Sequence, residues 1–298
     1  MILPPPLRKG DVIAILSPSG AAVRENVEKA AEAIHSRGYE PRIMPHALGR
    51  HGSFSGSEEE RLSDFTEAWH DPCVKALLCS RGGYGAVHLL PALDRMRLEE
   101  TPKWLIGFSD ISALHALMQH RGIASLHGPQ TRHLALHPDD TDPCTAALFG
   151  ALEGTPRAIE WGKTESDTPG TARGTLRGGN LAVISALIGT QFNPFKPGSI
   201  LVLEDIAEPI YKVERTLCQL RMAGLLDSLN GIVVGQFTDY HPDVNHASME
   251  AMIGKALCGL DIPVAFNAPV GHVERNMPLI LGSEAILHTD ASGSRLTF

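Results

Sequence analysis

The chain has 298 residues, which is enough for about two domains of ordinary size and a large buried core. Hydrophobic residues make up 43% of the chain and charged residues 20%, a composition typical of a globular protein and not of a disordered or fibrous one. The formal net charge of −8 argues against nucleic acid or an anionic membrane surface as a partner, because both select positively charged proteins.

Nothing in the sequence indicates a membrane segment or an exported protein. No stretch approaches the roughly 18 uninterrupted apolar residues of a membrane-spanning helix. Prolines at positions 4–6 stand where a signal peptide needs an apolar helical run. The cysteines form no Cys-x-x-Cys pair, which disfavours a zinc ribbon or a thioredoxin-type redox site. We therefore expect a cytoplasmic protein without a membrane partner, whose cysteines are reduced residues in or near the core. They are Cys73, Cys79, Cys144, Cys218 and Cys258.

Strand and helix signals alternate over residues 1–152. Apolar runs typical of buried parallel strands are found at 11–16, 74–79 and 104–108, and a further strand is expected near 41–44. A helical pattern with one apolar face follows the turn at 17–20, and Ser57–Glu60 reads as a capping box that opens the next helix. This alternation predicts an N-terminal α/β domain, with a parallel sheet wrapped by helices.

The second half of the chain has a different character. Residues 153–170 are rich in turn formers without apolar periodicity, which predicts a linker. Helices are expected at 209–226 and 245–258. Short strands are expected around 171–176, 200–203, 231–236, 264–267, 285–288 and 295–298. Residues 171–298 are therefore predicted to form a mixed, β-rich C-terminal domain.

The segment Gly107-Phe-Ser-Asp-Ile111 places a serine between a strand that ends at Phe108 and a helix over 111–120. Backbone amides and the helix dipole at such a junction can stabilise a developing oxyanion. The arrangement is similar to a nucleophile elbow, although Ile111 replaces the last glycine of Gly-x-Ser-x-Gly. The alternative is that Ser109 is only a helix N-cap.

A glycine-rich loop, Ser80-Arg-Gly-Gly-Tyr-Gly85, follows the third predicted strand. Glycines let backbone amides approach an oxyanion or a phosphate closely. Neither this loop nor the turn at 17–20 is the dinucleotide-binding fingerprint. Taken alone, either loop is more typical of a plain connection between a strand and a helix.

An acid and a histidine also follow predicted strands. The run 200–208 ends in three carboxylates, of which one could orient a histidine, or all could serve the following helix at Pro209. His272 follows a glycine in a loop beyond a strand, and a single histidine among fourteen could be structural. Serine, acid and histidine occur in the order of the α/β-hydrolases, but order alone does not show that they meet in space.

Several motifs together resemble the LD-carboxypeptidases, a family of serine peptidases. The resemblance covers nearly the whole chain, from Gly10 to Gly282, with the motifs in the same order as in the family. The family includes murein tetrapeptide carboxypeptidases and microcin C self-immunity proteins. The motifs are Ser80-Arg-Gly-Gly-Tyr-Gly85, Gly107-Phe-Ser-Asp110, Arg177-Gly-Gly-Asn-Leu181, Leu203-Glu-Asp205, Glu208-Pro-Ile-Tyr211, and Gly271-His272 with Asn276.

The resemblance implies a catalytic triad. Ser109 matches the family's nucleophile, His272 its base, and Glu204 the acid that holds the histidine. Asp205 and Glu208 are weaker candidates for the acid.

The resemblance also implies an oxyanion hole, a domain arrangement and an assembly. Backbone amides of Gly83 and Asp110 would bind the oxyanion, with Gly82 as the alternative to Gly83. The N-terminal domain would carry the serine and the C-terminal domain the acid and histidine, with the site at the domain boundary. A homodimer is implied, and no metal or cofactor is required.

The function implied is cleavage of murein tetrapeptides during cell-wall recycling, between the L-centre of a diamino acid and the terminal D-alanine. Within the family, the alternative substrate is a peptide-nucleotide antibiotic. An adenylate would favour aromatic stacking, to which an aromatic content of 5% does not point.

Two alternatives come from other classes of protein. A metal-dependent hydrolase could use His127, His133 and His137, although the sequence contains no His-Glu-x-x-His motif. A non-catalytic binding protein with two α/β lobes would fit the first half of the chain. It would not need a serine, an acid and a histidine placed after strands.

Overall fold

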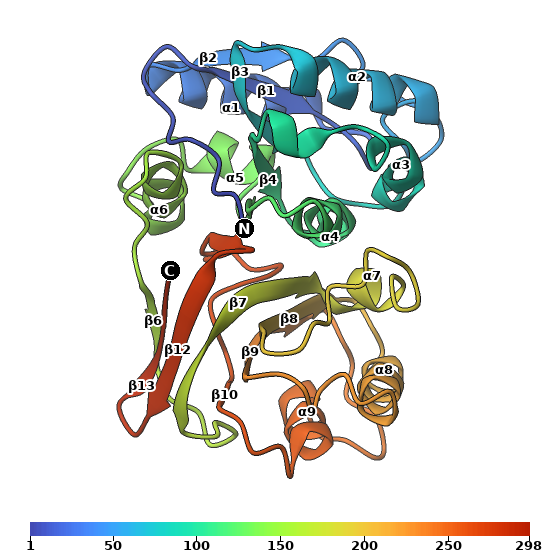
Figure 1. Ribbon diagram of the computed structural model, residues 1–298, viewed down its shortest axis with the longest axis vertical. Coiled ribbons are helices and arrows are strands. Elements are labelled where there is room, and N and C mark those ends of the chain that lie inside the picture. The colour runs from blue at the N-terminus through green and yellow to red at the C-terminus, as the bar shows by residue number, and fades with distance from the viewer. The chain divides into compact units, whose positions relative to one another are not determined.

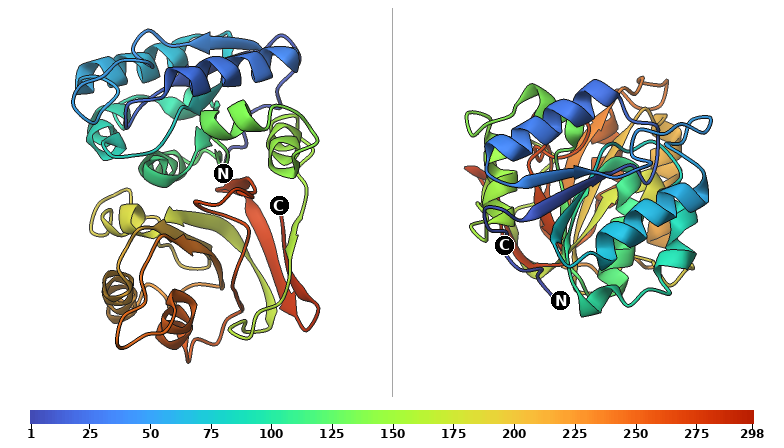
Figure 2. Two further views of the ribbon diagram at one scale, coloured as in Figure 1. Left: turned by 180° about the vertical axis from the view of Figure 1, so that it is seen from behind. Right: turned by 90° about the horizontal axis from the view of Figure 1, so that it is seen from above.

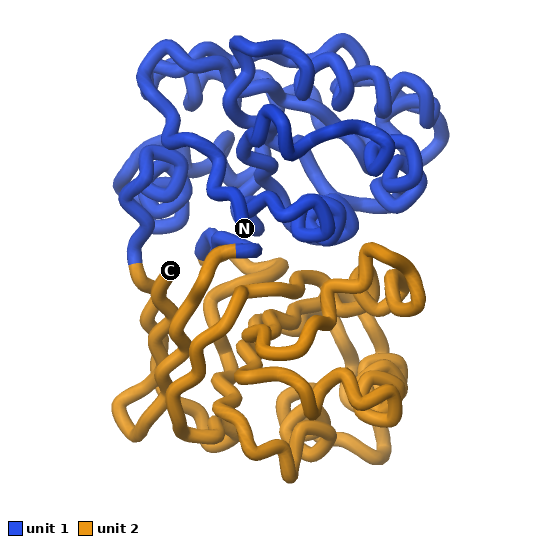
Figure 3. Tube along the Cα trace, in the orientation of Figure 1, with its two compact units in different colours: residues 1–157, 277–282 blue, residues 158–276, 283–298 orange.

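The computed structural model describes all residues, 1–298, and the chain divides into two compact units (Figure 3). Unit 1 comprises residues 1–157 and 277–282, and unit 2 comprises residues 158–276 and 283–298. Unit 1 contains a mostly parallel sheet with helices, and unit 2 contains a mixed sheet. The fold class predicted from the sequence is therefore confirmed.

The sheet of unit 1 has the strand order β11-β5-β4-β3-β1-β2. All neighbours are parallel except β11, which runs antiparallel to β5. The predicted runs at 11–16, 74–79 and 104–108 form strands whose side chains are mostly buried, because helices cover both faces of the sheet. The edge strand at 40–43 has no buried residue. The strands are β1 (Val12–Leu16), β2 (Glu40–Ile43), β3 (Val74–Cys79), β4 (Trp104–Gly107), β5 (Ser125–His127) and β11 (Leu279–Leu281).

Helices α1 and α2 lie on opposite faces of this sheet (Figure 2). Helix α2 begins with the predicted capping box, in which Ser57 Oγ accepts from the Glu60 amide and the Glu60 carboxylate accepts from the Ser57 amide. The helices are α1 (Arg24–Ser36), α2 (Glu58–His70), α3 (Ala86–Leu93), α4 (Ser112–His120), α5 (Thr131–Leu136) and α6 (Pro143–Leu152), with short 3₁₀ turns η1 (Leu98–Glu100) and η2 (Ser109–Ile111).

The strand order of unit 1 reverses between β1 and β3, because β2 lies on one side of β1 and the later strands lie on the other. Open α/β sheets place their ligand sites beyond the carboxyl ends of the strands at such a reversal. The turn at 17–20, the glycine loop at 80–85 and Ser109 follow β1, β3 and β4 at this edge.

The sheet of unit 2 has the order β10-β9-β8-β7-β12-β13-β6. Strand β7 pairs antiparallel with β12 through residues 170–175 and parallel with β8 through residues 176–180, so it joins an antiparallel half to a parallel half. The strands are β6 (Ile159–Trp161), β7 (Gly170–Asn180), β8 (Ile200–Ile206), β9 (Gly231–Thr238), β10 (Val264–Ala265), β12 (Glu284–Asp290) and β13 (Gly293–Thr297).

Three helices accompany the parallel half of this sheet (Figure 1). Leu201 and Leu203 of β8 belong to one buried apolar cluster with Val213, Leu217 and other residues of the helices and neighbouring strands. The core of unit 2 therefore lies between the parallel strands and the helices. The helices are α7 (Leu181–Ser185), α8 (Ile210–Met222) and α9 (Met249–Leu257).

Some local expectations require correction. Residues 153–170, predicted to be a linker, contain β6, which pairs with β13. Three residues are too short to show an alternating pattern, and their partner lies far along the chain. All five cysteines are free, but only Cys79 and Cys144 are buried, so the prediction of core positions is wrong for the exposed Cys73, Cys218 and Cys258.

None of the helices combines the length and the apolar character that crossing a membrane requires.

Candidate active site

Ser109 is the first residue of η2, at the sharp turn between β4 and α4. Its φ angle is +65°, a left-handed conformation that residues other than glycine seldom adopt. Such a position costs about 1–3 kcal/mol and persists only where the surroundings determine it. The N-cap positions of η2 and α4 are Phe108 and Ile111, and neither helix has a side-chain cap. Ser109 is therefore held at this turn for a reason other than capping.

Buried side chains fix the backbone on both sides of Ser109. The Asp110 carboxylate accepts hydrogen bonds from Ser19 Oγ at 2.6 Å and from the Ala86 amide at 2.9 Å. On the other side, His115 Nε2 donates to the Gly107 carbonyl at 2.8 Å. Burial lowers the pKa of His115 to about 3, so its imidazole is neutral at physiological pH.

The glycine loop 80–85 lies against Ser109. A Cβ built on Gly82 would be 2.6 Å from Ser109 Cβ and 2.7 Å from its Oγ, so only glycine fits there. Gly83 has φ +123° and is exposed, whereas Gly82 is buried. The Gly82 carbonyl accepts from the Gly20 amide at 3.2 Å, which ties the loop to the turn after β1.

In unit 2, the structure brings Glu204 and His272 together. Glu204 lies in β8 with no exposed side-chain surface, and its Oε2 is 2.8 Å from His272 Nδ1. Gly271, at φ +118°, passes so close that a Cβ there would be 2.9 Å from Glu204 Cβ. The Gly271 amide donates to Asn276 Oδ1 at 3.0 Å, which closes the loop that presents the histidine. A buried carboxylate thus holds one ring nitrogen of a partly exposed histidine.

Asp205 makes its hydrogen bonds elsewhere. It follows Glu204 on β8, and neighbouring residues of a strand point to opposite faces of the sheet. Its carboxylate accepts from Asn180 Nδ2 at 2.8 Å and from the Ala182 amide at 2.9 Å. Burial raises the pKa of Asp205 to about 6. The Asp205 carboxylate therefore binds groups at the start of α7.

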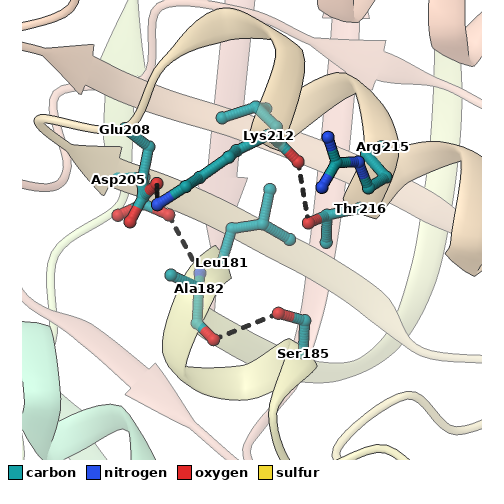
Figure 4. A pocket seen from close by; sticks show the side chains of 9 residues that line it. Leu181, Ala182, Ser185, Asp205, Glu208, Lys212, Arg215 and Thr216 are labelled. Carbon is teal, nitrogen blue, oxygen red and sulfur yellow. Dashed lines mark hydrogen bonds and ion pairs between the residues drawn. The ribbon is translucent and has the colours of Figure 1, made fainter.

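Glu208, the other weaker candidate, lies 3.3 Å from Lys212 Nζ, one turn further along. Asp205, Glu208 and Lys212 line a pocket of about 240 Å³ between α7 and α8 (Figure 4). The carboxylate of Glu208 thus pairs with Lys212 of α8 at the pocket.

The three histidines of the metal-hydrolase alternative do not form one cluster. His133 lies 2.8 Å from Asp142, and these two residues and Cys144 offer ligand atoms within 4.8 Å of one another. His137 contacts His133 through its ring, with 4.8 Å between centroids. His127 is buried in β5 instead. The only cluster of potential metal ligands therefore contains just one of the three histidines, His133.

Sequence reasoning missed two buried residues of this region, His115 and Arg61. Both act through hydrogen bonds to backbone carbonyls, which no motif records. A signal for Arg61 was present, because Arg61, Phe65 and Ala68 share the buried face of α2 at the spacing i, i+4, i+7. An arginine on an apolar stripe indicates a specific buried partner.

Comparisons with known proteins cover both units. Residues 13–128 match the family model described as the LD-carboxypeptidase N-terminal domain, and residues 173–287 match the LD-carboxypeptidase C-terminal domain. The murein tetrapeptide carboxypeptidase of Pseudomonas aeruginosa is 32% identical, over 95% of this chain and 94% of that protein.

Solved structures share the fold. The muramoyltetrapeptide carboxypeptidase from Oxalobacter formigenes superposes with a TM-score of 0.85 at 31% identity, covering 96% of this chain and 97% of the other. An MccF-like protein from Bacillus anthracis gives a TM-score of 0.86 at 26% identity, covering 100% and 99%.

Proposed function

Because the chain belongs to the LD-carboxypeptidase family of hydrolases, we propose that it is a serine carboxypeptidase acting on murein tetrapeptides. It would cleave the L,D peptide bond to the terminal D-alanine. The observation that carries this proposal is the buried Glu204–His272 hydrogen bond of 2.8 Å, which is the acid–base half of a catalytic triad. The left-handed turn at Ser109 supports the nucleophile.

The chemistry begins at Ser109. Its Oγ attacks the carbonyl carbon of the terminal peptide bond, while His272 Nε2 takes the hydroxyl proton and later delivers it to the leaving amine. Glu204 holds the Nδ1–H tautomer of the imidazole and stabilises the imidazolium that forms. Water then hydrolyses the acyl-enzyme by the same acid–base route.

Backbone amides of Gly83 and Asp110 would bind the oxyanion of the tetrahedral intermediate, with Gly82 as the alternative to Gly83. Preorganised donors of this kind are usually the largest electrostatic contribution to such catalysis. The contact of Gly82 with Ser109 and the exposure of Gly83 support this use of the loop. The mechanism needs neither a metal ion nor a cofactor.

The proposal includes a setting and an assembly. The family resemblance supports an enzyme of cell-wall recycling that works as a homodimer. The proline-rich start of the sequence favours a cytoplasmic location, and the net charge of −8 argues against a nucleic-acid or anionic membrane partner. Light scattering of the purified protein tests the dimer, and cell fractionation tests the location.

The alternative substrate is a peptide-nucleotide antibiotic, which the similarity to the MccF-like protein favours. Incubating the enzyme separately with a murein tetrapeptide and an aminoacyl-sulfamoyl adenosine, followed by mass spectrometry, distinguishes the two. We expect release of D-alanine from the tetrapeptide at the higher kcat/KM. Cleavage of the nucleotide conjugate alone contradicts the murein assignment, and cleavage of neither contradicts both.

A further inference from the structure

Arg61 of α2 is buried beneath the loops that follow β1 and β3. Its side chain is 3% exposed, and burial lowers the pKa of its guanidinium. One nitrogen, Nη1, donates to the Pro18 carbonyl at 2.6 Å and to the Gly85 carbonyl at 2.9 Å. The guanidinium carbon lies 4.9 Å from the centre of the Phe54 ring. A buried charge is costly, and Nε has no hydrogen-bond partner, so general stability does not account for an arginine here.

Arg61 and Asp110 bind opposite sides of the same peptide unit. Arg61 Nη1 binds the Gly85 carbonyl, and the Asp110 carboxylate accepts from the amide of the next residue, Ala86. Asp110 directly follows Ser109 in the chain. The end of the glycine loop is therefore held by the helix beneath it and by the residue beside the proposed nucleophile.

The same two side chains also hold the turn after β1. Arg61 binds the Pro18 carbonyl, and Asp110 accepts from Ser19 Oγ at 2.6 Å. The end of the loop packs closely against these groups, because a Cβ on Gly85 would lie 2.8 Å from the Phe54 ring and 3.0 Å from Arg61 Nη1. Both connections at this edge of the sheet thus take their position from one buried pair of charged groups.

We propose that Arg61 is a positioning residue that fixes the glycine loop 80–85, so that its amides meet the oxyanion formed at Ser109. This inference rests on the proposed function. Arg61 acts through the loop and does not touch the substrate. Loss of an oxyanion donor costs about 10²–10³-fold in kcat, and a misplacement of about 1 Å costs about 10²-fold. We therefore expect Arg61→Met to lower kcat about 10²-fold and to change KM by less than about threefold.

Three variants separate positioning from stability. Arg61→Met keeps the unbranched stem and removes both carbonyl contacts, whereas Arg61→Lys keeps the charge and a donor and should retain more activity. The matched control is Lys103→Met. Lys103 is 5% exposed and donates through Nζ to the carbonyls of Ala68 and Asp71 at the other end of α2. It is thus a buried cation on two carbonyls, without contact to the glycine loop.

Two readouts are measured on folded protein, verified by circular dichroism and melting curves. The first is steady-state hydrolysis of the tetrapeptide. The second is the rate at which a fluorophosphonate labels Ser109. This labelling reaction depends on the oxyanion loop but requires no particular peptide substrate. We expect kcat and labelling to fall together in Arg61→Met, less in Arg61→Lys, and by less than threefold in Lys103→Met.

Labelling and kcat of Arg61→Met within threefold of wild type overturn the inference, as does an equal loss in Lys103→Met. If Arg61→Met does not fold, the same criterion applies to Arg61→Gln, which also removes the charge and is too short to reach both carbonyls. A wild type that is labelled but leaves the tetrapeptide intact contradicts the substrate, while labelling still tests Arg61. A wild type that is not labelled contradicts both the nucleophile and the inference.

Discussion

At Ser109 the backbone adopts a conformation that serine seldom takes, and neighbouring buried groups maintain it. The Gly107 carbonyl is bound by His115, and the Asp110 side chain is bound by Ser19 and Ala86. Backbone strain of this kind concentrates at functional sites, where the surrounding structure compensates for it. The reactivity that we propose for Ser109 therefore depends on the buried groups that hold its backbone on both sides.

The first prediction concerns Ser109 itself. We expect Ser109→Ala to fold and to hydrolyse the tetrapeptide at least ~10³-fold more slowly, because the covalent route is lost. Release of D-alanine is measured beside a melting curve. Turnover within tenfold of wild type contradicts the nucleophile and favours a non-covalent mechanism.

The second prediction compares the candidate acids. Glu204 is fully buried against His272, whereas the ion pair of Glu208 is made with Lys212. We expect Glu204→Gln to cost more activity than Glu208→Gln, since an amide can select the wrong tautomer and cannot stabilise the imidazolium. The corresponding change in the standard serine-protease example lowers kcat about 10⁴-fold, and we expect a smaller but large loss here.

Glu208→Gln should mainly change stability, by about 1 kcal/mol or less. Measurements of kcat and melting curves for both variants decide the assignment. An inactive Glu208→Gln beside a nearly normal Glu204→Gln would place the triad acid at residue 208.

The third prediction is a pH dependence of stability from His115. Its folded pKa, about 3, is lowered by burial from 6.5, so the unfolded chain binds a proton below pH 6.5 that the folded chain does not. Stability is therefore lost as the pH falls below about 6.5, by up to ~1.4 kcal/mol per pH unit. His115→Gln removes this dependence.

Urea melts at pH 7, 6 and 5 measure the effect. The free energy of unfolding of wild type should fall relative to His115→Gln by about 2 kcal/mol between pH 7 and 5. The exposed His35→Gln is the control and should follow the wild-type curve. Parallel curves for wild type and His115→Gln contradict the buried neutral imidazole.

At the scale of elements, the sequence predicts what local patterns determine. Long apolar runs predict β1 and β3, and the capping box predicts the start of α2. Strands β5, β6 and β11 have three residues each and were not predicted, because so short a segment shows no periodicity. Their existence depends on pairing with distant strands.

Some residues of the candidate site could also be predicted from local sequence, whereas others could not. Motif resemblance predicts Ser109, Glu204 and His272, and the structure places Glu204 against His272. The roles of Arg61 and His115 depend on carbonyls brought to them by tertiary folding, so no spacing along the chain reveals them. The only local indication is for Arg61, which is a charged residue on the apolar face of α2.

The fourth prediction tests the contact between the glycine loop and Ser109. Gly82→Ala places a methyl group 2.6 Å from Ser109 Cβ, so we expect about 1–3 kcal/mol of destabilisation and a loss of activity. In a Ser109→Gly background the clash is removed, and the same change should cost less stability. Gly162→Ala is the control, because its added methyl group would have no atom within 4 Å. Equal destabilisation in both backgrounds contradicts the contact.

At the scale of the whole molecule, the residues proposed for the triad come from both units. Ser109 belongs to unit 1, whereas Glu204 and His272 belong to unit 2. Each half is built within its own core, the serine by the parallel sheet and the acid–histidine pair by β8 and its following loop. The proposed activity therefore requires the intact chain.

The fifth prediction concerns metal ions. We expect activity to survive exhaustive dialysis against EDTA, because the proposed triad requires no Lewis acid. The group of His133, Asp142 and Cys144 makes the experiment informative, since a metal bound there would be removed. Loss of turnover on chelation and its restoration by zinc would support the metal-hydrolase alternative instead.

Strand β11 has a consequence for biosynthesis. It completes the sheet of unit 1 beside β5, yet it follows nearly all of unit 2 in the chain. A ribosome adding 5–20 residues per second needs roughly 6–25 s for the roughly 120 intervening residues. Throughout that time the nascent unit 1 has an unpaired edge at β5, and open edges invite aggregation. The newly made chain is thus vulnerable until β11 has paired with β5, and a chaperone that shields exposed strands during this period would raise the yield of folded protein.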